Sequence, residues 1–555
     1  MKVGAVAGSA ALALAMATAC GPPRLPDDTA ARVALAVGAR SSAERTAGGP
    51  TAMSPATLSF VQPPTPLRGA NGLACRERQL LVAEALGGRV LRVAADGSFE
   101  SIPLPSGVRG PRDLAVDGAG NVYVAAAVSG EVWRQRASDG GWNVVARGLS
   151  EASGITLDAR GRVFAAICDD DGRIVELDPE GRGAPRPVAS GLGCPGAMTA
   201  DGDQALIVPL RTAGSVVRVG LADGVSGTVA EGLRVPTAVE RAPDGTLVVV
   251  ESATGVIREL AIPNDAGSSG AERARLAPGL DGFATCGESG VASNFVTGEI
   301  TVFKPWPSGP RVLERGGLAE PHGLAQAGED LLVSDGVSIR RIRGSSVDLL
   351  AATTIDGIPP PFALAIGSGG SAWVTVPELG EVHRVDLVER TSRKVAGGLD
   401  RPTSILATSD GGVIVADTGA GRIVRIEADG STRTLASGLV SPLGLALRGG
   451  QILTTEPTGG RVLGIREGSP PALVATALAA PGGVAADAAG HVFVAETRTG
   501  ALLRLDPDGS HRKVATGFAF GDAETDPSPI AMLAAPDGSI LVALPSNGSI
   551  ARVKP

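Results

Sequence analysis

The chain has 555 residues, including 78 glycines and 40 prolines, and only 3% of its residues are aromatic. So much glycine argues against a helical bundle, and a hydrophobic fraction of 43% is too high for a disordered chain. The formal net charge is −8, so the sequence carries no basic footprint and we expect no nucleic-acid partner.

The first residues are typical of an export signal. Lys2 is followed by an apolar run of small residues, Val3 to Ala19, which is too short to span a bilayer well. Small residues followed by Cys20 resemble a bacterial lipobox, although Ala17 stands where leucine is usual. We predict a signal peptide over residues 1–19 and lipidation of Cys20. The alternative is an ordinary signal peptide with a chance cysteine.

Residues 20–56 comprise this cysteine and a stretch rich in proline, alanine, arginine and serine, which predicts a flexible tether. We therefore expect an exported protein that is lipid-anchored in the cell envelope. In a Gram-negative organism it would sit at the outer membrane or in the periplasm. The anchor would be its sole contact with the membrane, and we expect a monomer.

From Ala70 onward the chain repeats one unit, with spacings of 40, 41, 40 and 39 residues between Pro321 and Pro481. Each unit holds four short apolar runs, separated by turns that contain glycine, which predicts hairpin-linked strands. A period of this length in such a chain indicates a propeller blade. The twelve units begin at Ala70, Pro111, Ala152, Pro195, Pro236, near Gly282, and at Pro321, Pro361, Pro402, Pro442, Pro481 and Pro529.

The segment VADTGAGRIVRIEADG, Val415 to Gly430, resembles the signature of NHL-type repeats. The repeats are also similar to a wider set of six-bladed propellers, which includes the SMP-30/gluconolactonase group and the virginiamycin B lyase group. This resemblance implies an all-β fold of two tandem six-bladed β-propellers with four-stranded antiparallel blades. We place the first ring at residues 57–309 and the second at residues 310–555.

The two ends of the repeat region predict how the rings close. The last repeat stops in its third strand at Ile550–Val553, and Thr57–Val61 precedes the first repeat like an orphan fourth strand. Exposed strand edges are a liability that ring closure removes. We predict that Thr57–Val61 pairs with the sixth blade, at Val302–Phe303, and that Arg311–Leu313 completes the last blade.

An acidic residue often follows the second strand of a repeat. One interpretation is a ring of carboxylates at the axial mouth of the second propeller, binding a divalent cation such as Ca²⁺ or a cationic ligand. The alternative is that each carboxylate caps its own turn. The sequence identifies no other cofactor and leaves the metal ligands open. The acidic positions are Glu84 and Glu251 in the first ring, and Asp335, Glu378, Asp417, Glu456 and Glu496 in the second.

His322 begins a first strand near the axial mouth of the second ring. In sequences similar to the virginiamycin B lyase group, a histidine in such a loop serves as a base, a role that suits histidine near neutral pH. We predict that any catalytic site uses His322, with Asp335 as its nearest acid. The alternative is a permissive loop position. A single well-placed histidine argues against zinc-dependent chemistry.

Four cysteines follow Cys20, and export would permit them to form disulfides. Cys75 and Cys286 lie near the first strands of blades one and six, which are neighbours in a closed six-membered ring. Cys168 and Cys194 lie in loops on one face. One interpretation is the pairs Cys75–Cys286 and Cys168–Cys194, among the three connectivities that four cysteines allow. The alternative is four buried free thiols.

Three classes of function remain open. The absence of a nucleophile motif favours a non-catalytic binding or scaffold module, whose partner is an unknown protein, peptide or small molecule. The alternative is an enzyme, either a lyase or a lactonase-like hydrolase, with its site at the axial mouth of the second ring. The third class is a purely structural spacer.

Overall fold

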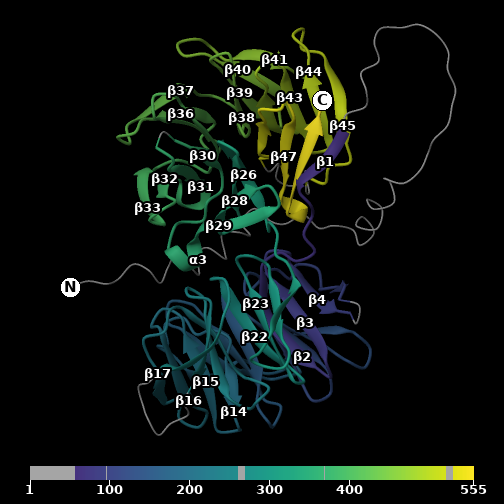
Figure 1. The fold of residues 1–555 in the computed structure, drawn as a ribbon, viewed down its shortest axis with the longest axis vertical. Helices are drawn as coiled ribbons and strands as arrows, with labels where there is room; N and C mark the ends of the chain where they lie inside the picture. Colours follow the sequence, from purple (N-terminus) through teal and green to yellow (C-terminus); the bar gives the residue numbers. More distant parts are fainter. Residues whose placement is uncertain (1–56, 95–96, 261–268, 368, 521–528) are drawn as a thin grey trace, which may run out of the picture.

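The computed structural model describes residues 57–94, 97–260, 269–367, 369–520 and 529–555, and every structural statement below refers to these residues. They form twelve four-stranded antiparallel sheets in two rings (Figure 1). Cys20 and the predicted signal peptide and tether lie outside the described residues. Within the described ranges, no helix is long and apolar enough to cross a membrane.

Six sheets of consecutive strands make the first ring. In each sheet the first strand lies at the ring axis and the fourth at the rim. Their strands are β2 (Ala70–Arg76), β3 (Gln79–Glu84), β4 (Arg89–Val93) and β5 (Phe99–Ile102); β6 (Pro111–Val116), β7 (Val122–Ala126), β8 (Glu131–Gln135) and β9 (Trp142–Arg147); β10 (Ala152–Leu157), β11 (Val163–Ile167), β12 (Arg173–Leu177) and β13 (Arg186–Ala189); β14 (Thr199–Asp201), β15 (Ala205–Leu210), β16 (Ser215–Gly220) and β17 (Ser226–Ala230); β18 (Pro236–Arg241), β19 (Leu247–Glu251), β20 (Val256–Leu260) and β21 (Ser269–Arg275); and β22 (Leu280–Cys286), β23 (Ser289–Asn294), β24 (Ile300–Phe303) and β25 (Pro310–Glu314).

The second ring has five sheets of the same kind and a sixth that combines both ends of the described chain. Its strands are β26 (Pro321–Ala327), β27 (Asp330–Asp335), β28 (Ser338–Arg343) and β29 (Ser346–Ala352); β30 (Leu364–Ile366), β31 (Ala372–Val376), β32 (Glu381–Asp386) and β33 (Thr391–Ala396); β34 (Pro402–Ala407), β35 (Val413–Asp417), β36 (Arg422–Ile426) and β37 (Thr432–Ala436); β38 (Leu445–Arg448), β39 (Gln451–Glu456), β40 (Arg461–Ile465) and β41 (Ala472–Ala475); β42 (Pro481–Ala486), β43 (Val492–Glu496), β44 (Ala501–Leu505) and β45 (His511–Thr516); and β46 (Met532–Ala534), β47 (Ile540–Leu544), β48 (Ser549–Lys554) and β1 (Thr57–Gln62). Short helices occur at α3 (Thr353–Asp356), η1 (Pro377–Leu379) and η2 (Pro545–Asn547).

The hydrophobic core lies between neighbouring sheets. Second strands such as β7 and β11 are buried along their whole length, because each is covered by a sheet on both faces. Their nearly continuous β-branched and alanine sequences fit this double burial. Outer strands such as β37 are exposed at their first three residues.

Each ring closes on itself after six sheets. In the first ring, the inner strand β22 packs against β2, and an apolar cluster that contains Leu73, Val82 and Val291 fills the gap. In the second ring, β26 packs against β46 and β47, with Leu324 and Leu541 in the shared cluster. The predicted fold class, two six-bladed propellers, is confirmed.

The predicted strand exchange between the rings is wrong. The strand β1 pairs with β48, with Thr57 opposite Lys554 and Phe60 opposite Ala551. The strand β25 pairs with β24 instead, within its own sheet. The sixth sheet of the first ring therefore runs to Glu314, beyond the boundary that we placed between residues 309 and 310, and residues 57–62 join the C-terminal sheet.

A buried tryptophan explains this outcome. The loop between β24 and β25 carries Trp306, whose ring packs edge-on against Phe283 at 5.0 Å and Phe303 at 5.1 Å between centroids. The loop therefore folds back onto its own sheet, and a short hairpin loop costs little closure entropy. The last sheet is left without an outer strand, and β1 fills that place.

The first ring exchanges no strand between its ends, but a disulfide joins its first and last sheets. Cys75 on β2 is bonded to Cys286 on β22, with their α-carbons 5.3 Å apart and a sequence separation of 211. Constraining so long a loop in the unfolded chain is worth about 5 kcal/mol in the chain-entropy account. The two rings thus close by different means, one covalent and the other by backbone pairing.

The two rings touch through a small apolar cluster. Leu86 and Phe295, in loops of the first ring, lie in one cluster with Val337 and Ala352 of the second. Polar contacts support this junction, since Arg340 donates to the carbonyl of Val296 at 3.0 Å. A second bond runs from the Arg68 side chain to the carbonyl of Pro545 at 3.2 Å.

Removing β1 is expected to open the last sheet of the second ring. In a variant that begins at Pro63, the outer edge of β48 has no partner, so its amides that bond to β1 lose protection. Hydrogen exchange measured by mass spectrometry should be faster in β48 and unchanged in the first ring. A chain that begins at residue 51 is the matched control. Full protection of β48 in the shortened variant would contradict the pairing.

Candidate functional site

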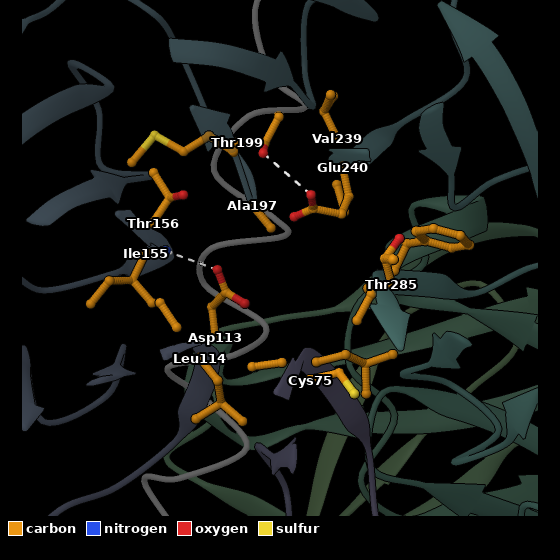
Figure 2. A pocket seen from close by; sticks show the side chains of 18 of the residues that line it. Cys75, Asp113, Leu114, Ile155, Thr156, Ala197, Thr199, Val239, Glu240 and Thr285 are labelled. Atoms are coloured by element: carbon orange, nitrogen blue, oxygen red, sulfur yellow. Dashed lines mark hydrogen bonds between the residues drawn. The ribbon is translucent and has the colours of Figure 1, made fainter. Parts of the chain in front are cut away.

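The axis of the first ring contains a cavity of about 290 Å³. All six inner strands or their leading segments contribute to its wall, from Leu73 on β2 round to Thr285 on β22. Most of the lining is small or apolar, as expected where six strands converge. Two ionisable side chains, Asp113 and Glu240, depart from this pattern and face the cavity (Figure 2).

Asp113 occupies a position that is otherwise reserved for small residues. With the repeats aligned on their first inner-strand residue, the third residue is glycine, alanine or serine in eleven of the twelve repeats and aspartate only here. The carboxylate fits because its neighbour is Gly72, where a β-carbon would lie 2.5 Å from the α-carbon of Asp113. One carboxylate oxygen accepts the backbone N–H of Ile155 at 2.8 Å.

Glu240 breaks the same pattern two residues further along the strand. The fifth residue of the aligned repeats is alanine, threonine or leucine except at Glu240. Its carboxylate accepts the N–H of Arg241 at 2.7 Å and the hydroxyl of Thr199 at 3.4 Å. Positions three and five share one side of a strand, so both carboxylates face the axis from β6 and β18.

Burial strongly affects both carboxylates. Loss of solvent, together with the negative charges of Asp281 and Glu240, raises the pKa of Asp113 to about 7, against the hydrogen bond from Ile155. Burial likewise raises the pKa of Glu240 to about 7, although the charge of Arg241 opposes this rise. Among the described residues, no basic side chain forms an ion pair with either carboxylate at the distances that the other pairs show.

The mouth of this cavity is also polar. The inner strands β2, β6, β10, β18 and β22 each carry a β-bulge after the first residue, which takes the second residue out of the ladder, as between Pro111 and Asp113. Bulges re-aim side chains. The second residues of the first ring are Asn71, Arg112, Ser153, Gly196, Thr237 and Asp281.

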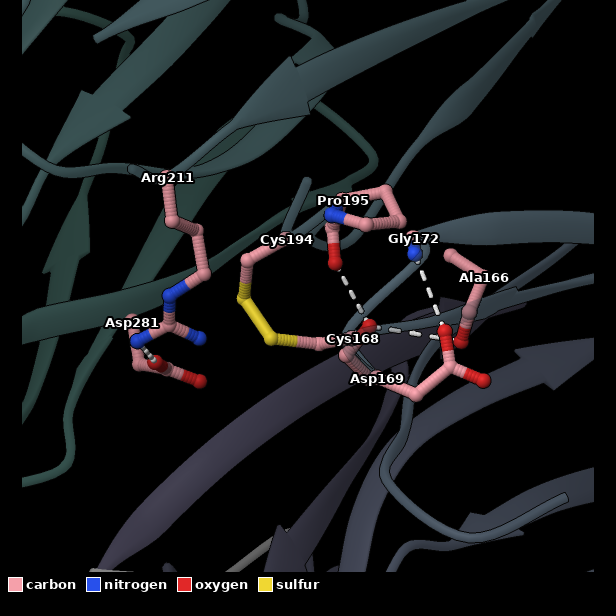
Figure 3. The surroundings of a disulfide bond; sticks show 9 residues. Ala166, Cys168, Asp169, Gly172, Cys194, Pro195, Arg211 and Asp281 are labelled. Atoms are coloured by element: carbon pink, nitrogen blue, oxygen red, sulfur yellow. Dashed lines mark hydrogen bonds and ion pairs between the residues drawn. A yellow bond between two sulfur atoms is a disulfide. The ribbon is translucent and has the colours of Figure 1, made fainter. Parts of the chain in front are cut away.

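Arg211, which directly follows β15, joins this polar mouth. Its guanidinium lies 3.7 Å from the carboxylate of Asp281, which also accepts the amide of Asn71 at 2.9 Å. The second disulfide, Cys168–Cys194, lies beside it (Figure 3). The backbone N–H of Arg211 donates to the carbonyl of Cys194 at 2.9 Å, so the disulfide-bonded loop positions this arginine.

His322 lies between an aromatic ring and a carboxylate. Its ring stacks on Phe362 with centroids 4.7 Å apart, and Nε2 lies 3.8 Å from the carboxylate of Glu320. The predicted partner, Asp335, instead accepts the backbone N–H groups of Ala319 and Glu320, each at 2.7 Å. Partial burial raises the pKa of Glu378, and the charge of His322 opposes that rise.

The carboxylates that follow the second strands accept backbone N–H groups from the loops that precede the first strands of their own sheets. Asp417 accepts the N–H of Asp400 and pairs with Arg422, each at 2.6 Å. Such a carboxylate holds the loop that enters its own sheet through backbone N–H groups. This contact resembles the alternative interpretation, in which each carboxylate caps its own turn. The same arrangement recurs for Glu84 with Arg68 and Arg89, Glu251 with Arg234 and Arg258, Glu456 with Val440 and Arg461, and Glu496 with Ala479 and Thr499.

These contacts leave the predicted cation site without a donor set. Within the described segments, no three histidine, cysteine or acidic side chains lie close enough together to hold a metal ion. Asp417 and Glu456 are fully buried, and both are already engaged with arginines and backbone N–H groups. A role for these carboxylates in binding Ca²⁺ therefore stays a prediction of the sequence.

The charge of Asp113 is expected to make stability depend on pH. Its folded-state pKa lies above that of an exposed aspartate, so between about pH 4 and pH 7 the folded chain holds a proton that the unfolded chain has lost. The free energy of unfolding should therefore fall as pH rises through this window. Asp113→Asn, which keeps an acceptor for Ile155, removes this effect and should be more stable than wild type at pH 8, by at most about 4 kcal/mol.

Urea unfolding at pH 5 and pH 8, followed by tryptophan fluorescence, tests this prediction. Three of the four tryptophans, Trp133, Trp142 and Trp306, lie in the first ring, so the signal reports mainly on that ring. Glu329→Gln, at an exposed turn of the second ring, is the control. The expectation fails if the free energy of unfolding changes by the same amount in wild type and in Asp113→Asn between pH 5 and pH 8.

Comparison with known proteins gives one clear relative. A stretch of 201 residues is 30% identical to the virginiamycin B lyase of Nocardia farcinica and covers 36% of this chain and 67% of that protein. No family model matches the chain. A gluconolactonase structure from Xanthomonas campestris is 16% identical with a TM-score of 0.35, and covers 43% of this chain and 86% of that one. The nidogen/laminin complex contains a chain that is 17% identical with a TM-score of 0.32, covering 39% of this chain and 89% of that one.

Proposed function

We propose that this chain, which belongs to the virginiamycin B lyase family, binds a small cationic molecule in the axial cavity of its first ring. Asp113 and Glu240 are the anionic walls of this site. The observation that carries the proposal is the pair of buried carboxylates that face one cavity without a basic partner.

The energetic cost of this arrangement supports a ligand. A carboxylate removed from water without a counter-ion is costly, and the cost is met by protonation or by a bound cation. Nothing in the repeat architecture requires these two acids, because small or uncharged residues fill the same positions in the other blades. A cation bound between the two carboxylates would offset the cost of burying their negative charges.

The volume of the cavity limits the ligand. At about 290 Å³ it lies at the lower end of the range of ligand pockets, which is about 300–1,000 Å³. The ligand, or the part of it that enters the channel, is therefore small. A protonated amine on a short carbon chain matches both the size and the charge of the site.

The affinity for a small amine is expected to depend on both carboxylates. Calorimetric titration with n-butylamine at pH 8, where the carboxylates are ionised, should show binding that n-butanol does not. Asp113→Asn and Glu240→Gln should each weaken it by about tenfold, a typical loss for one charge-assisted contact. Glu329→Gln serves as the control variant. Equal binding of butanol, or unchanged binding in both variants, would refute the proposal.

The same site predicts how amine binding depends on pH. A bound cation lowers the pKa of each carboxylate, so binding near pH 6 should release protons, and affinity should rise with pH until the carboxylates are fully ionised. Titrations in buffers of different ionisation enthalpy count these protons. Asp281 and Arg241 are the other charged groups that face the two carboxylates.

A lyase is the second candidate function. The curated relative is a lyase, and an elimination needs a base that removes a proton. A carboxyl group with a pKa of about 7, such as Asp113 or Glu240, is suited to that role near neutral pH. Turnover of virginiamycin B that Asp113→Asn or Glu240→Gln abolishes would favour this candidate, whereas loss in a His322→Gln variant alone would favour the second ring.

The cellular setting stays a proposal from sequence. Export, lipidation of Cys20 and an envelope location are supported by the N-terminal residues alone. A tether of this kind would hold the propellers at a membrane surface while leaving the mouth of the first ring open to small molecules. The monomeric state and the identity of any protein partner are likewise predictions.

A further inference from the structure

The mouth of the first ring contains two arginines whose hydrogen-bonding capacity is largely unused. We infer that Arg112 and Arg211 form a subsite for a carboxylate, next to the cavity that holds Asp113 and Glu240. Combined with the proposed function, on which this second step rests, the ligand is a small zwitterion with a carboxylate at one end and an amine at the other.

Arg112 is buried and poorly partnered. Its side chain comes from the bulge of β6, and its residue is 9% exposed. The buried Nε has no hydrogen-bond partner, and within the described residues no acidic group lies within ion-pair distance of this guanidinium. The charge of Arg112 still acts on Glu151. Burial raises the pKa of Glu151, and the positive charge of Arg112 opposes this rise.

Arg211 reaches the same mouth from the fourth sheet, two sheets away from that of Arg112. Its side chain is 9% exposed, and its one close acidic group, Asp281, lies 3.7 Å away. Most arginines that form ion pairs in the described residues lie much closer to their partners, such as Arg422 with Asp417 at 2.6 Å. Burial, together with the positive charge of Arg112, lowers the pKa of Arg211 to about 10, against the negative charge of Asp281.

Two buried guanidinium groups of like charge repel each other and have each lost water. A carboxylate placed between them would relieve both costs, because the planar fork of arginine matches carboxylate oxygens. The unpartnered Oδ1 of Asn71 is a further buried polar atom at this mouth. Asp281 supplies only part of the required negative charge, because it is shared between Arg211 and the amide of Asn71.

Arg112 and Asp281 lie next to residues that line the cavity, and Arg211 lies beside Asp281. Arg112 immediately precedes Asp113, and Asp281 immediately precedes Gly282, which also lines the cavity. The charge of Asp281 is close enough to raise the pKa of Asp113. A short molecule can therefore place its anionic end at the mouth and its cationic end among the carboxylates.

The test compares three probes of equal length in the full chain: butyrate, n-butylamine and γ-aminobutyrate. Calorimetric titration at pH 8 should show that γ-aminobutyrate binds at least about tenfold more tightly than either single-ended probe, since two subsites act on one molecule. Arg112→Gln and Arg211→Gln should each weaken the binding of butyrate and of γ-aminobutyrate by about tenfold. Binding of n-butylamine should persist in both variants, which also shows that they fold.

Two further variants separate the guanidinium geometry from charge and position. Arg211→Lys keeps the charge but loses the fork, so it should restore only part of the butyrate affinity. Arg109→Gln removes an exposed arginine from the same loop region and should change nothing. Butyrate affinity that is equal in wild type, Arg112→Gln and Arg211→Gln would overturn the carboxylate subsite.

The outcomes also distinguish this inference from the proposed function. If n-butylamine binds but butyrate does not, the carboxylate subsite is refuted and the cation site stands. If butyrate binding depends on the two arginines but n-butylamine does not bind, the subsite stands and the cation site is refuted. Binding of γ-aminobutyrate no tighter than that of its parts would refute the zwitterion.

Discussion

Crowding at the axis governs both rings, because six inner strands have to approach one another there. At Gly282, for example, a β-carbon would lie 2.6 Å from the carbonyl oxygen of Asn71 in the next sheet. Small residues at the third position of nearly every repeat satisfy this constraint. A carboxylate at the same position, Asp113, is accommodated only because Gly72 beside it leaves space. The candidate site therefore arises where one blade departs from the packing rule that the others follow.

The same positions distinguish the two mouths. In the first ring, the bulged second residues are mostly polar or charged, with Arg112 and Asp281 among them. In the second ring, Phe362, Leu443 and Ile530 occupy equivalent positions and are buried. Apolar side chains there pack against neighbouring blades, as His322 does against Phe362. The two propellers share one architecture but present different chemistry at their axes, and the cavity lies in the polar one.

Much of the fold could be predicted from the repeats, because each strand and turn carries its own local signal. The exchange of strands could not, because it depends on whether residues 310–314 fold back locally, and the contact of Trp306 with Phe283 decides this. The site was missed for another reason. Aligned repeats reveal Asp113 and Glu240 as exceptions, but the repeat pattern alone does not show that the two face one cavity. Arg211 directly follows β15, and its approach to Asp281 depends on the disulfide-linked segment at Cys194.

The pairing of β1 with β48 has a consequence for synthesis of the protein. The first strand to leave the ribosome belongs to the last sheet to be completed, and the whole first ring is made in between. At the usual rates of translation, β1 waits on the order of a minute for its partner. During that time, its unpaired backbone and the side chains of Leu58 and Phe60 are available to chaperones or to other nascent chains. The first ring needs no such delay, because its six sheets are made in consecutive order.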